Sequence, residues 1–189
     1  MRLFLAVDFA DTVKTEIHRA IDALEIPHPP WRWVSAANLH MTLKFLGETP
    51  RERVGPLCEC AEKVCRSVEP FTIRLGRLGA FPGISRPRVL FYEVEQGAAS
   101  LRSLAEALDT ALSGRMGLPR DERPFQAHAT VARVKKPLRA RMVTALRAAP
   151  PLAGVSQTVE SVTLFESALR PKGPIYHHLK GFALAKSKC

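Results

Sequence analysis

The sequence predicts an α+β fold, and two observations carry this prediction. Segments with alternating apolar residues, typical of strands, are interleaved with fewer segments that have helical spacing. A strand with the pattern His-x-Thr, then a helix and two more strands, occurs in each half, around LHMTLKFLGE and AHATVARVKK. This shared order resembles an internal duplication, although identity between the halves outside the motif is thin.

Strands outnumber helices in the first half of the chain. Asp11 is expected to cap the first helix, and Pro27, Pro29 and Pro30 to close it. Gly47 is expected to end the strand with the first motif, before a second helix. The predicted strands are 3–9, 31–34, 38–46, 71–78 and 88–94, and the predicted helices are 11–24 and 50–68.

The second half begins with an amphipathic helix after Gly97. Its apolar residues fall at i, i+3 and i+4 spacing, and it is expected to end near Gly114 or Gly117. The residues that define its apolar face are Leu101, Leu104, Ala105, Leu108 and Leu112. Strands are then predicted at 127–134, 155–165 and 176–185, with a helix at 139–148.

Composition indicates a soluble globular chain with a basic surface. Its 189 residues are 46% apolar and 24% charged, enough for one core, so we expect residues 1–189 to form a single two-lobed domain. A formal charge of +10 favours a polyanionic partner, with nucleic acid first. An acidic residue at position 8 and the lack of a long apolar run argue against a signal peptide, a membrane span or a membrane partner. We expect a cytoplasmic protein.

The cysteines do not have the spacing of a metal site. Three of them, Cys58, Cys60 and Cys65, fall in one predicted helix without a CxxC pair or a histidine at zinc-ligand spacing, and Cys189 ends the chain. We expect reduced thiols, and no metal or other cofactor.

The two His-x-Thr motifs carry the chemistry. In a strand, side chains alternate between faces, so His40 and Thr42 point the same way, as do His128 and Thr130. Two imidazoles at one site supply a general acid and a general base, and the hydroxyls can donate to phosphate oxygens. A single histidine in such a strand would be interpreted as a core residue, and a single threonine as a residue that favours strands. The repeated offset favours phosphoester chemistry without a metal.

Other candidates follow from strand parity and residue type. Lys44 shares the face of His40 and Thr42 by parity and could bind substrate, although a solvated lysine at a strand end is as plausible. Arg133 falls on the opposite face from His128 unless a bulge re-aims it. His177 and His178 lack a threonine at the motif offset, and we expect at least one of them at the surface. The aromatic residues that could include a base-stacking platform are Trp31, Trp33, Phe81, Phe91 and Tyr176.

These segments resemble a known family over nearly the whole chain. The similar stretches are RLFLAVDF, LHMTLKFLGE, GRLGAFP before PRVLF, RPF before HATVARV, and LFES followed by a tyrosine. They are similar to the bacterial and archaeal RNA 2′,3′-cyclic phosphodiesterases, first named 2′-5′ RNA ligases, of the two-histidine phosphoesterase superfamily. The resemblance implies a two-lobed fold with pseudo-twofold symmetry, in which antiparallel sheets line a basic central cleft and helices lie outside. We expect a monomer.

The resemblance also implies residue roles. His40 would donate a proton and His128 would accept one as a terminal 2′,3′-cyclic phosphate opens to a 2′-phosphate. Thr42 and Thr130 would hold the phosphate, and Arg133 would contact it. The chain departs from the family at Ala127 and Ala10, where prolines are usual, but neither change removes a reactive group.

Three functions remain open at this stage. The first is hydrolysis of RNA 2′,3′-cyclic phosphate ends, with 2′-5′ ligation of RNA ends as its reverse. The second is a basic RNA-binding module without turnover, in which the histidines only contact phosphate. The third keeps the enzyme but changes its substrate to a small cyclic nucleotide or a 2′-5′ oligonucleotide.

Overall fold

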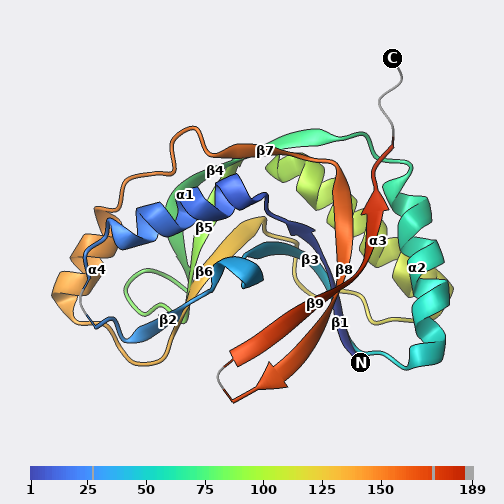
Figure 1. Cartoon of the computed structure of the whole chain (residues 1–189), viewed down its shortest axis with the longest axis horizontal. Helices are drawn as coiled ribbons and strands as arrows, with labels where there is room; N and C mark the ends of the chain where they lie inside the picture. Colours follow the sequence, from blue (N-terminus) through green and yellow to red (C-terminus); the bar gives the residue numbers. More distant parts are fainter. Residues whose placement is uncertain (27, 172, 186–189) are drawn as a thin grey trace.

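The computed structural model describes residues 1–26, 28–171 and 173–185. It contains two antiparallel sheets with helices on their outer sides (Figure 1). The first sheet has the order β3-β1-β8-β9 and the second has the order β2-β6-β5-β4-β7. The α+β prediction is therefore confirmed.

The chain enters both sheets more than once. The strands are β1 (Arg2–Asp8), β2 (Trp31–Trp33), β3 (His40–Glu48), β4 (Phe71–Phe81), β5 (Val89–Gln96), β6 (His128–Val134), β7 (Ser156–Val159), β8 (Ser161–Arg170) and β9 (Gly173–Ala183). The helices are α1 (Asp11–Asp22), the short 3₁₀ helix η1 (Ala36–Asn38), α2 (Arg51–Cys65), α3 (Ala98–Met116) and α4 (Ala140–Arg147). Helix α3 packs against α2 and β3, and α2 also contacts β9.

The two sheets are built on the same plan. The motif strand β3 pairs with β1, which pairs with β8, and the motif strand β6 pairs with β5, which pairs with β4. One apolar core contains buried residues from both sheets, including Met41 from β3 and Ala129 from β6. This repeated order agrees with the duplication suggested by the sequence.

Three boundary predictions were wrong. The strand expected at 155–165 is two strands in different sheets, because the chain leaves β7 at Val159 and starts β8 at Ser161 beside β1. The last strand starts at Gly173, since β8 and β9 form a hairpin that reaches Arg170. Asp11 does not cap α1: Ala10 holds the cap position without a side-chain hydrogen bond, and Asp11 supplies negative charge in the first turn.

Other local predictions have mixed outcomes. Helix α3 ends before Gly117, which adopts a left-handed conformation with φ of 61°, so the later of the two predicted ends is right. Cys58, Cys60 and Cys65 are free thiols on the buried side of α2, and burial raises the pKa of Cys65 to about 12. Pro27 and Cys189 lie outside the described residues. Helices long and apolar enough to cross a membrane are not found in the described part of the chain.

Both motif strands contain a bulge three residues after the histidine. Leu5 on β1 faces Lys44, but Ala6 faces Thr42, so Leu43 is an extra residue. In the same way, Leu90 on β5 faces Ala132 and Phe91 faces Thr130, so Val131 is extra. A bulge shifts the alternation of side chains by one position. The residues directly after it, Lys44 and Phe45 in β3 and Ala132 and Arg133 in β6, therefore point to the face opposite to that predicted from an ideal strand.

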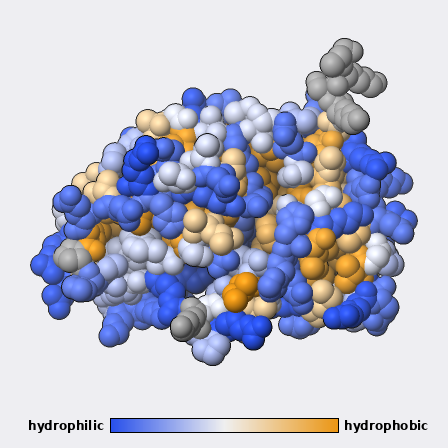
Figure 2. All heavy atoms as spheres, viewed as in Figure 1, coloured by the Kyte–Doolittle hydropathy of each residue, from blue (hydrophilic) through white to orange (hydrophobic). Residues whose placement is uncertain are grey.

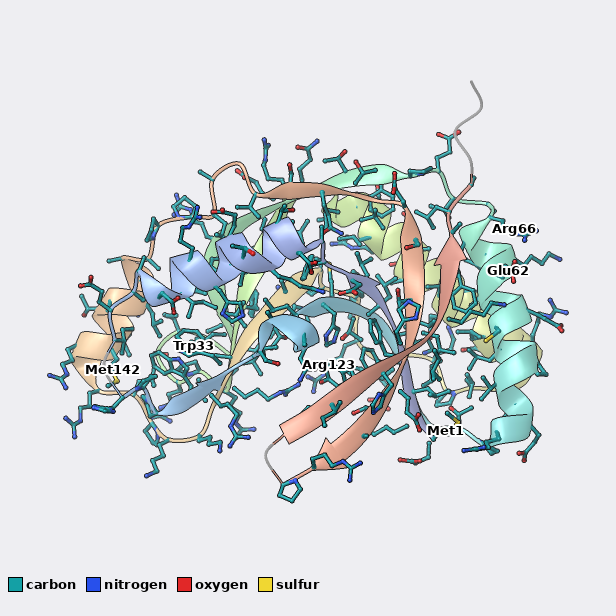
Figure 3. All side chains as sticks on the ribbon, in the orientation of Figure 1. Met1, Trp33, Glu62, Arg66, Arg123 and Met142 are labelled. Carbon is teal, nitrogen blue, oxygen red and sulfur yellow. The ribbon has the colours of Figure 1, made fainter. Side chains whose placement is uncertain are left out.

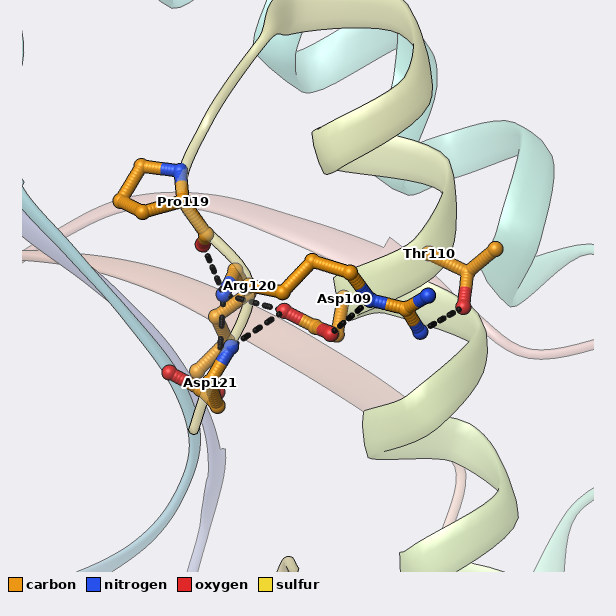
Figure 4. A network of polar contacts seen from close by, with 6 residues as sticks. Asp109, Thr110, Pro119, Arg120 and Asp121 are labelled. Carbon is orange, nitrogen blue, oxygen red and sulfur yellow. Dashed lines mark hydrogen bonds and ion pairs between the residues drawn. The ribbon is translucent and has the colours of Figure 1, made fainter. Parts of the chain in front are cut away.

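The bulge makes the prediction for Lys44 wrong. Its side chain lies on the core side, 1% exposed, instead of beside His40 and Thr42. The Lys44 ammonium donates to Asp109 Oδ1 at 2.5 Å and to the Pro119 carbonyl oxygen at 3.2 Å (Figure 4). Asp109 also accepts from Arg120 Nε at 3.1 Å and from the Asp121 backbone N–H at 3.2 Å.

This network ties three parts of the chain together, namely β3, α3 and the segment after α3. Burial raises the pKa of the Asp109 carboxyl, but hydrogen bonds from Lys44 and Arg120 outweigh burial, and the net pKa lies below its ordinary value of 3.8. The stabilisation that this carboxylate provides is therefore complete above that ordinary value and is lost as the pH falls through the folded-state pKa.

We expect Lys44→Met to lower the free energy of unfolding by about 3 kcal/mol, because it leaves a buried carboxylate without its main partner. The double variant Lys44→Met/Asp109→Leu should recover part of that loss. Urea unfolding followed by circular dichroism measures both. The matched control is Glu16→Ala, which breaks the exposed pair with Arg19 and should cost less than about 0.5 kcal/mol. A Lys44→Met loss no larger than the control would contradict a stabilising role for the network.

Candidate functional site

The two motif histidines lie on neighbouring strands of different sheets. Strands β3 and β6 contact each other, and the motif histidines are close enough for a proton on the His128 ring to disfavour one on His40. Each histidine and its threonine are partly exposed on one face, while the residue between them is fully buried, Met41 in one strand and Ala129 in the other. The predicted alternation therefore holds at the motifs themselves, and each strand presents its histidine and threonine on the same face.

His40 is held at both ring nitrogens. Nδ1 lies 2.7 Å from the carbonyl oxygen of Asn38, and Nε2 lies 3.0 Å from the hydroxyl oxygen of Thr42. A carbonyl can only accept, so Nδ1 carries the proton and Nε2 is the nitrogen whose protonation can change. Thr42 donates to Nε2 when the ring is neutral and accepts from it when the ring is charged.

His128 is oriented by the same type of contact. Its Nδ1 lies 2.7 Å from the carbonyl oxygen of Gln126, again two residues earlier in the chain. Nδ1 is the donor here as well, which leaves Nε2 as the reactive nitrogen. Thr130 shares the face of His128 and is also partly exposed. The two halves thus present the same tautomer of the same side chain, each with a hydroxyl nearby.

Phenylalanine rings support both imidazoles. Phe4 on β1 and Phe165 on β8 stack at 5.2 Å, and their centroids lie 4.9 Å and 6.2 Å from that of His40. Phe91 on β5 and Phe81 on β4 stack at 4.2 Å, and their centroids lie 5.3 Å and 5.1 Å from that of His128. The paired rings come from equivalent strands of the two sheets. They leave little freedom for the imidazoles to rotate.

A tyrosine and a glycine complete these supports. Tyr176 on β9 stands edge-on to His40, with centroids 5.1 Å apart. Gly79 on β4 faces Phe91, and a Cβ atom at Gly79 would lie 2.7 Å from that ring. Gly79 therefore lets Phe91 lie close to β4 and reach His128. Three of the aromatic candidates, Phe81, Phe91 and Tyr176, thus pack against motif histidines, whereas Trp31 is buried against Trp33.

A carboxylate lies across the strand pair from each histidine. Asp8 on β1 faces His40, and Glu93 on β5 faces His128. Burial lowers the pKa of His40 below its ordinary value of 6.5, the Asn38 carbonyl and the Asp8 charge raise it, and Arg133 and His128 lower it. The net pKa is below 6.5, so in the absence of an anion His40 is mostly neutral at pH 7.

Arg133 reaches the site because of the bulge in β6. The shift after Val131 places it on the same face as His128, as the sequence analysis required for a role there. Burial raises the pKa of Tyr176, and the charge of Arg133 partly opposes this rise; the same charge lowers the pKa of His40, so the guanidinium lies near both rings. The equivalent position in β3 is Phe45, which is 64% exposed. Lys44, by contrast, is directed into the core. His177 and His178 are both exposed on β9, which fits the prediction of a surface histidine.

Several residues of this site were not found from the sequence. Phe4, Asp8 and Phe165 belong to strands that were predicted, but the pairing of those strands decides which rings and charges meet His40. Asn38 is also new: its side-chain amide donates to the Pro174 carbonyl oxygen at 2.9 Å while its own carbonyl holds His40. The β8–β9 hairpin is thereby linked to the orientation of that imidazole.

Comparison with known proteins agrees with this architecture. The LigT like Phosphoesterase family matches residues 7–91 and 93–176, and each segment contains one His-x-Thr motif. A Thermus thermophilus protein named RNA 2′,3′-cyclic phosphodiesterase is 35% identical over 97% of this chain and 90% of its own length. An Archaeoglobus fulgidus protein of the same name is 34% identical over 96% and 99%, respectively.

Solved structures share the whole fold. The crystal structure of TT0787 of Thermus thermophilus has a TM-score of 0.83 and 33% identity, with all of both chains covered. The structure of E. coli LigT complexed with 3′-AMP has a TM-score of 0.81 and 30% identity, with 98% of each chain covered. The resemblance inferred from the motifs is therefore confirmed, and this chain belongs to the LigT-like phosphoesterase family.

Proposed function

We propose that this protein hydrolyses the 2′,3′-cyclic phosphate at the end of an RNA strand to a 2′-phosphate, using the two motif histidines as acid and base without a metal. The observation that carries the proposal is the matched pair of imidazoles, each with Nδ1 held by a carbonyl and Nε2 available at a common site. The names of the relatives supply the substrate class.

The reaction needs two proton transfers on opposite sides of the phosphorus atom. In our proposal, Nε2 of His128 removes a proton from water as the water oxygen bonds to phosphorus. Nε2 of His40 donates its proton to the ribose 3′ oxygen as the bond between that oxygen and phosphorus breaks. The product is a 2′-phosphate with a free 3′-hydroxyl. Each transfer contributes about 10²–10⁴-fold to the rate.

The remaining side chains stabilise the phosphate. Thr42 and Thr130 donate hydroxyl hydrogen bonds to nonbridging oxygens, where charge builds up in the transition state. The planar guanidinium of Arg133 suits two of these oxygens better than a lysine would. The phosphate in turn raises the pKa of His40, so that substrate binding produces the protonated form that the donor role requires. These residues supply acid, base and anion stabilisation from the protein alone.

Ligation would use the same groups. A 5′-hydroxyl in place of water would lose its proton to His128 and attack the cyclic phosphate, and His40 would again protonate the leaving 3′ oxygen, which gives a 2′-5′ linkage. Water at ~55 M favours hydrolysis unless two RNA ends are held close together. We therefore propose ligation only as a minor activity.

The reaction is tested with an oligoribonucleotide that ends in a 2′,3′-cyclic phosphate, incubated in EDTA. We expect a product with a 2′-phosphate, and a fall in kcat by a factor of about 10² or more for His40→Ala and for His128→Ala. His177→Ala is the matched control, because this histidine is exposed on β9 and outside the site. Circular dichroism verifies that the variants are folded.

Each alternative outcome has a defined meaning. A 3′-phosphate product would contradict the proposed bond cleavage, and turnover only with added metal would contradict the metal-free mechanism. Salt-dependent RNA binding without turnover, unchanged in both histidine variants, would favour an RNA-binding module. Preference for a cyclic mononucleotide or a 2′-5′ oligonucleotide, measured as kcat/KM, would change the substrate.

A second prediction concerns the protonation of His40. Its pKa in the free protein should lie below 6.5 and should rise when inorganic phosphate binds, because the anion favours the charged ring. Asp8→Asn should lower the pKa further by removing an attractive charge. Arg133→Gln should raise it by removing a repulsive one. NMR titration of the His40 ring follows all three, and a phosphate-independent pKa would contradict the proposed donor role.

A further inference from the structure

A second basic site lies at the end of the sheet that carries His128. An open cavity of about 980 Å³ is lined by β2, the segment that follows β6, and the start of α4. Its permanent cations are Arg32, Lys135, Lys136, Arg139 and Arg141. Figure 3 shows Trp33 from β2 and Met142 from α4 at the same end of the molecule, and both line this cavity.

Most of the positive charge of this cavity has no carboxylate partner. Among the described residues that line it there is no aspartate or glutamate. Lys135, Lys136, Arg139 and Arg141 are exposed and form no ion pair with any carboxylate in the described part of the chain.

The opposite end of the molecule is different. Arg66 on α2 pairs with Glu62, which also accepts from Lys180 on β9, and Figure 3 labels the first two residues. Figure 2 shows an apolar area on the side where α2 and β9 lie. The cavity end, by contrast, gathers four cations that the protein leaves without a carboxylate, and this favours a ligand with several negative charges.

Strands β6 and β2 connect the histidine site to the cavity. Arg133, which reaches the histidines, lies directly opposite Arg32 on β2, and Arg32 lines the cavity. Two residues further along the chain, Lys135 donates its backbone N–H to the Pro30 carbonyl oxygen and its side chain lines the cavity. A row of positive charge thus leads from His128 along β6 into the cavity.

The length of this row defines the ligand. At about 3.3 Å per residue, the seven steps from His128 to Lys135, just past the end of β6, span at most about 23 Å. A stacked nucleic-acid strand rises about 3.4 Å per nucleotide, so a ligand that touches both ends contains several nucleotides. A 2′,3′-cyclic phosphate blocks both hydroxyls of the terminal ribose, so its RNA strand can continue only on the 5′ side.

We propose that this cavity binds the single-stranded RNA on the 5′ side of the cyclic phosphate. This inference rests on the proposed function. The lysine and arginine side chains contact backbone phosphates, and Trp33, which is half-buried, offers an apolar face to a base. The cavity thus makes the protein select an RNA strand over a mononucleotide that carries the same cyclic phosphate.

The test compares two substrates, a 2′,3′-cyclic mononucleotide and an eight-nucleotide RNA with a 2′,3′-cyclic phosphate end. The variants are Lys135→Ala/Lys136→Ala and Arg139→Ala/Arg141→Ala. The control is Arg102→Ala/Arg115→Ala, which removes the same charge from exposed positions on α3. Thermal unfolding checks that all three are folded.

We expect each cavity variant to raise KM for the RNA by about tenfold while kcat and the mononucleotide KM stay unchanged. The control should behave as the unmodified protein on both substrates. Binding of a fluorescent RNA that ends in a 2′-phosphate should show a salt slope that falls by about 0.7 for each phosphate that a variant no longer neutralises.

The outcomes separate the two proposals. Turnover of neither substrate by the unmodified protein would contradict the proposed function, and the binding measurement would still decide whether the cavity holds RNA. Turnover of both substrates with the same kcat/KM, or an equal effect of the cavity and control variants on RNA binding, would overturn the cavity proposal.

Discussion

The site depends on one constraint, the hydrogen bond from each histidine Nδ1 to the carbonyl oxygen two residues earlier in the chain. This bond selects the tautomer, so that Nε2 is the titrating nitrogen in both halves. It also fixes the orientation of the ring, and the stacked phenylalanine pairs pack against each imidazole. The acceptor is a backbone carbonyl, so this hydrogen bond does not depend on which side chain stands two residues before the histidine. In both halves the histidine is also the first residue of its strand. The same device can therefore operate in two sheets whose other side chains differ.

The bulges show how one backbone feature gives two different results. In β3 the bulge turns Lys44 inward, where it joins Asp109 in the core, and leaves Phe45 on the outer face. In β6 it turns Ala132 inward and brings Arg133 to the histidines. The backbone is equivalent, but only one half places a cation beside its histidine. The two halves thus form an asymmetric site, which suits the proposed reaction because its phosphate has distinct attacking and leaving oxygens.

Sequence patterns predicted the elements and the face of each motif, because alternation and residue spacing are local properties. Parity alone placed His40 with Thr42 on one face of β3, and His128 with Thr130 on one face of β6. Lys44 was misplaced by the same parity, since a bulge depends on the pairing of β3 with β1 and leaves no mark in the letters of β3. The split between β7 and β8 was missed for a similar reason: the chain changes sheets without a glycine or proline at the junction. The support of His40 by Phe4 and Phe165 required knowledge of strand order.

Burial and charge at His40 act in opposition, and their balance gives the site its response to substrate. Burial and the positive charge of Arg133 lower the pKa of the free His40 imidazole, while the Asn38 carbonyl and Asp8 moderate the shift. In the proposed mechanism, the substrate phosphate brings a negative charge into these low-dielectric surroundings, where charges interact more strongly than in water. The charge of Arg133, which disfavours a proton on His40 in the free protein, would attract this phosphate. Our proposal therefore links substrate binding to protonation of His40, so that each favours the other.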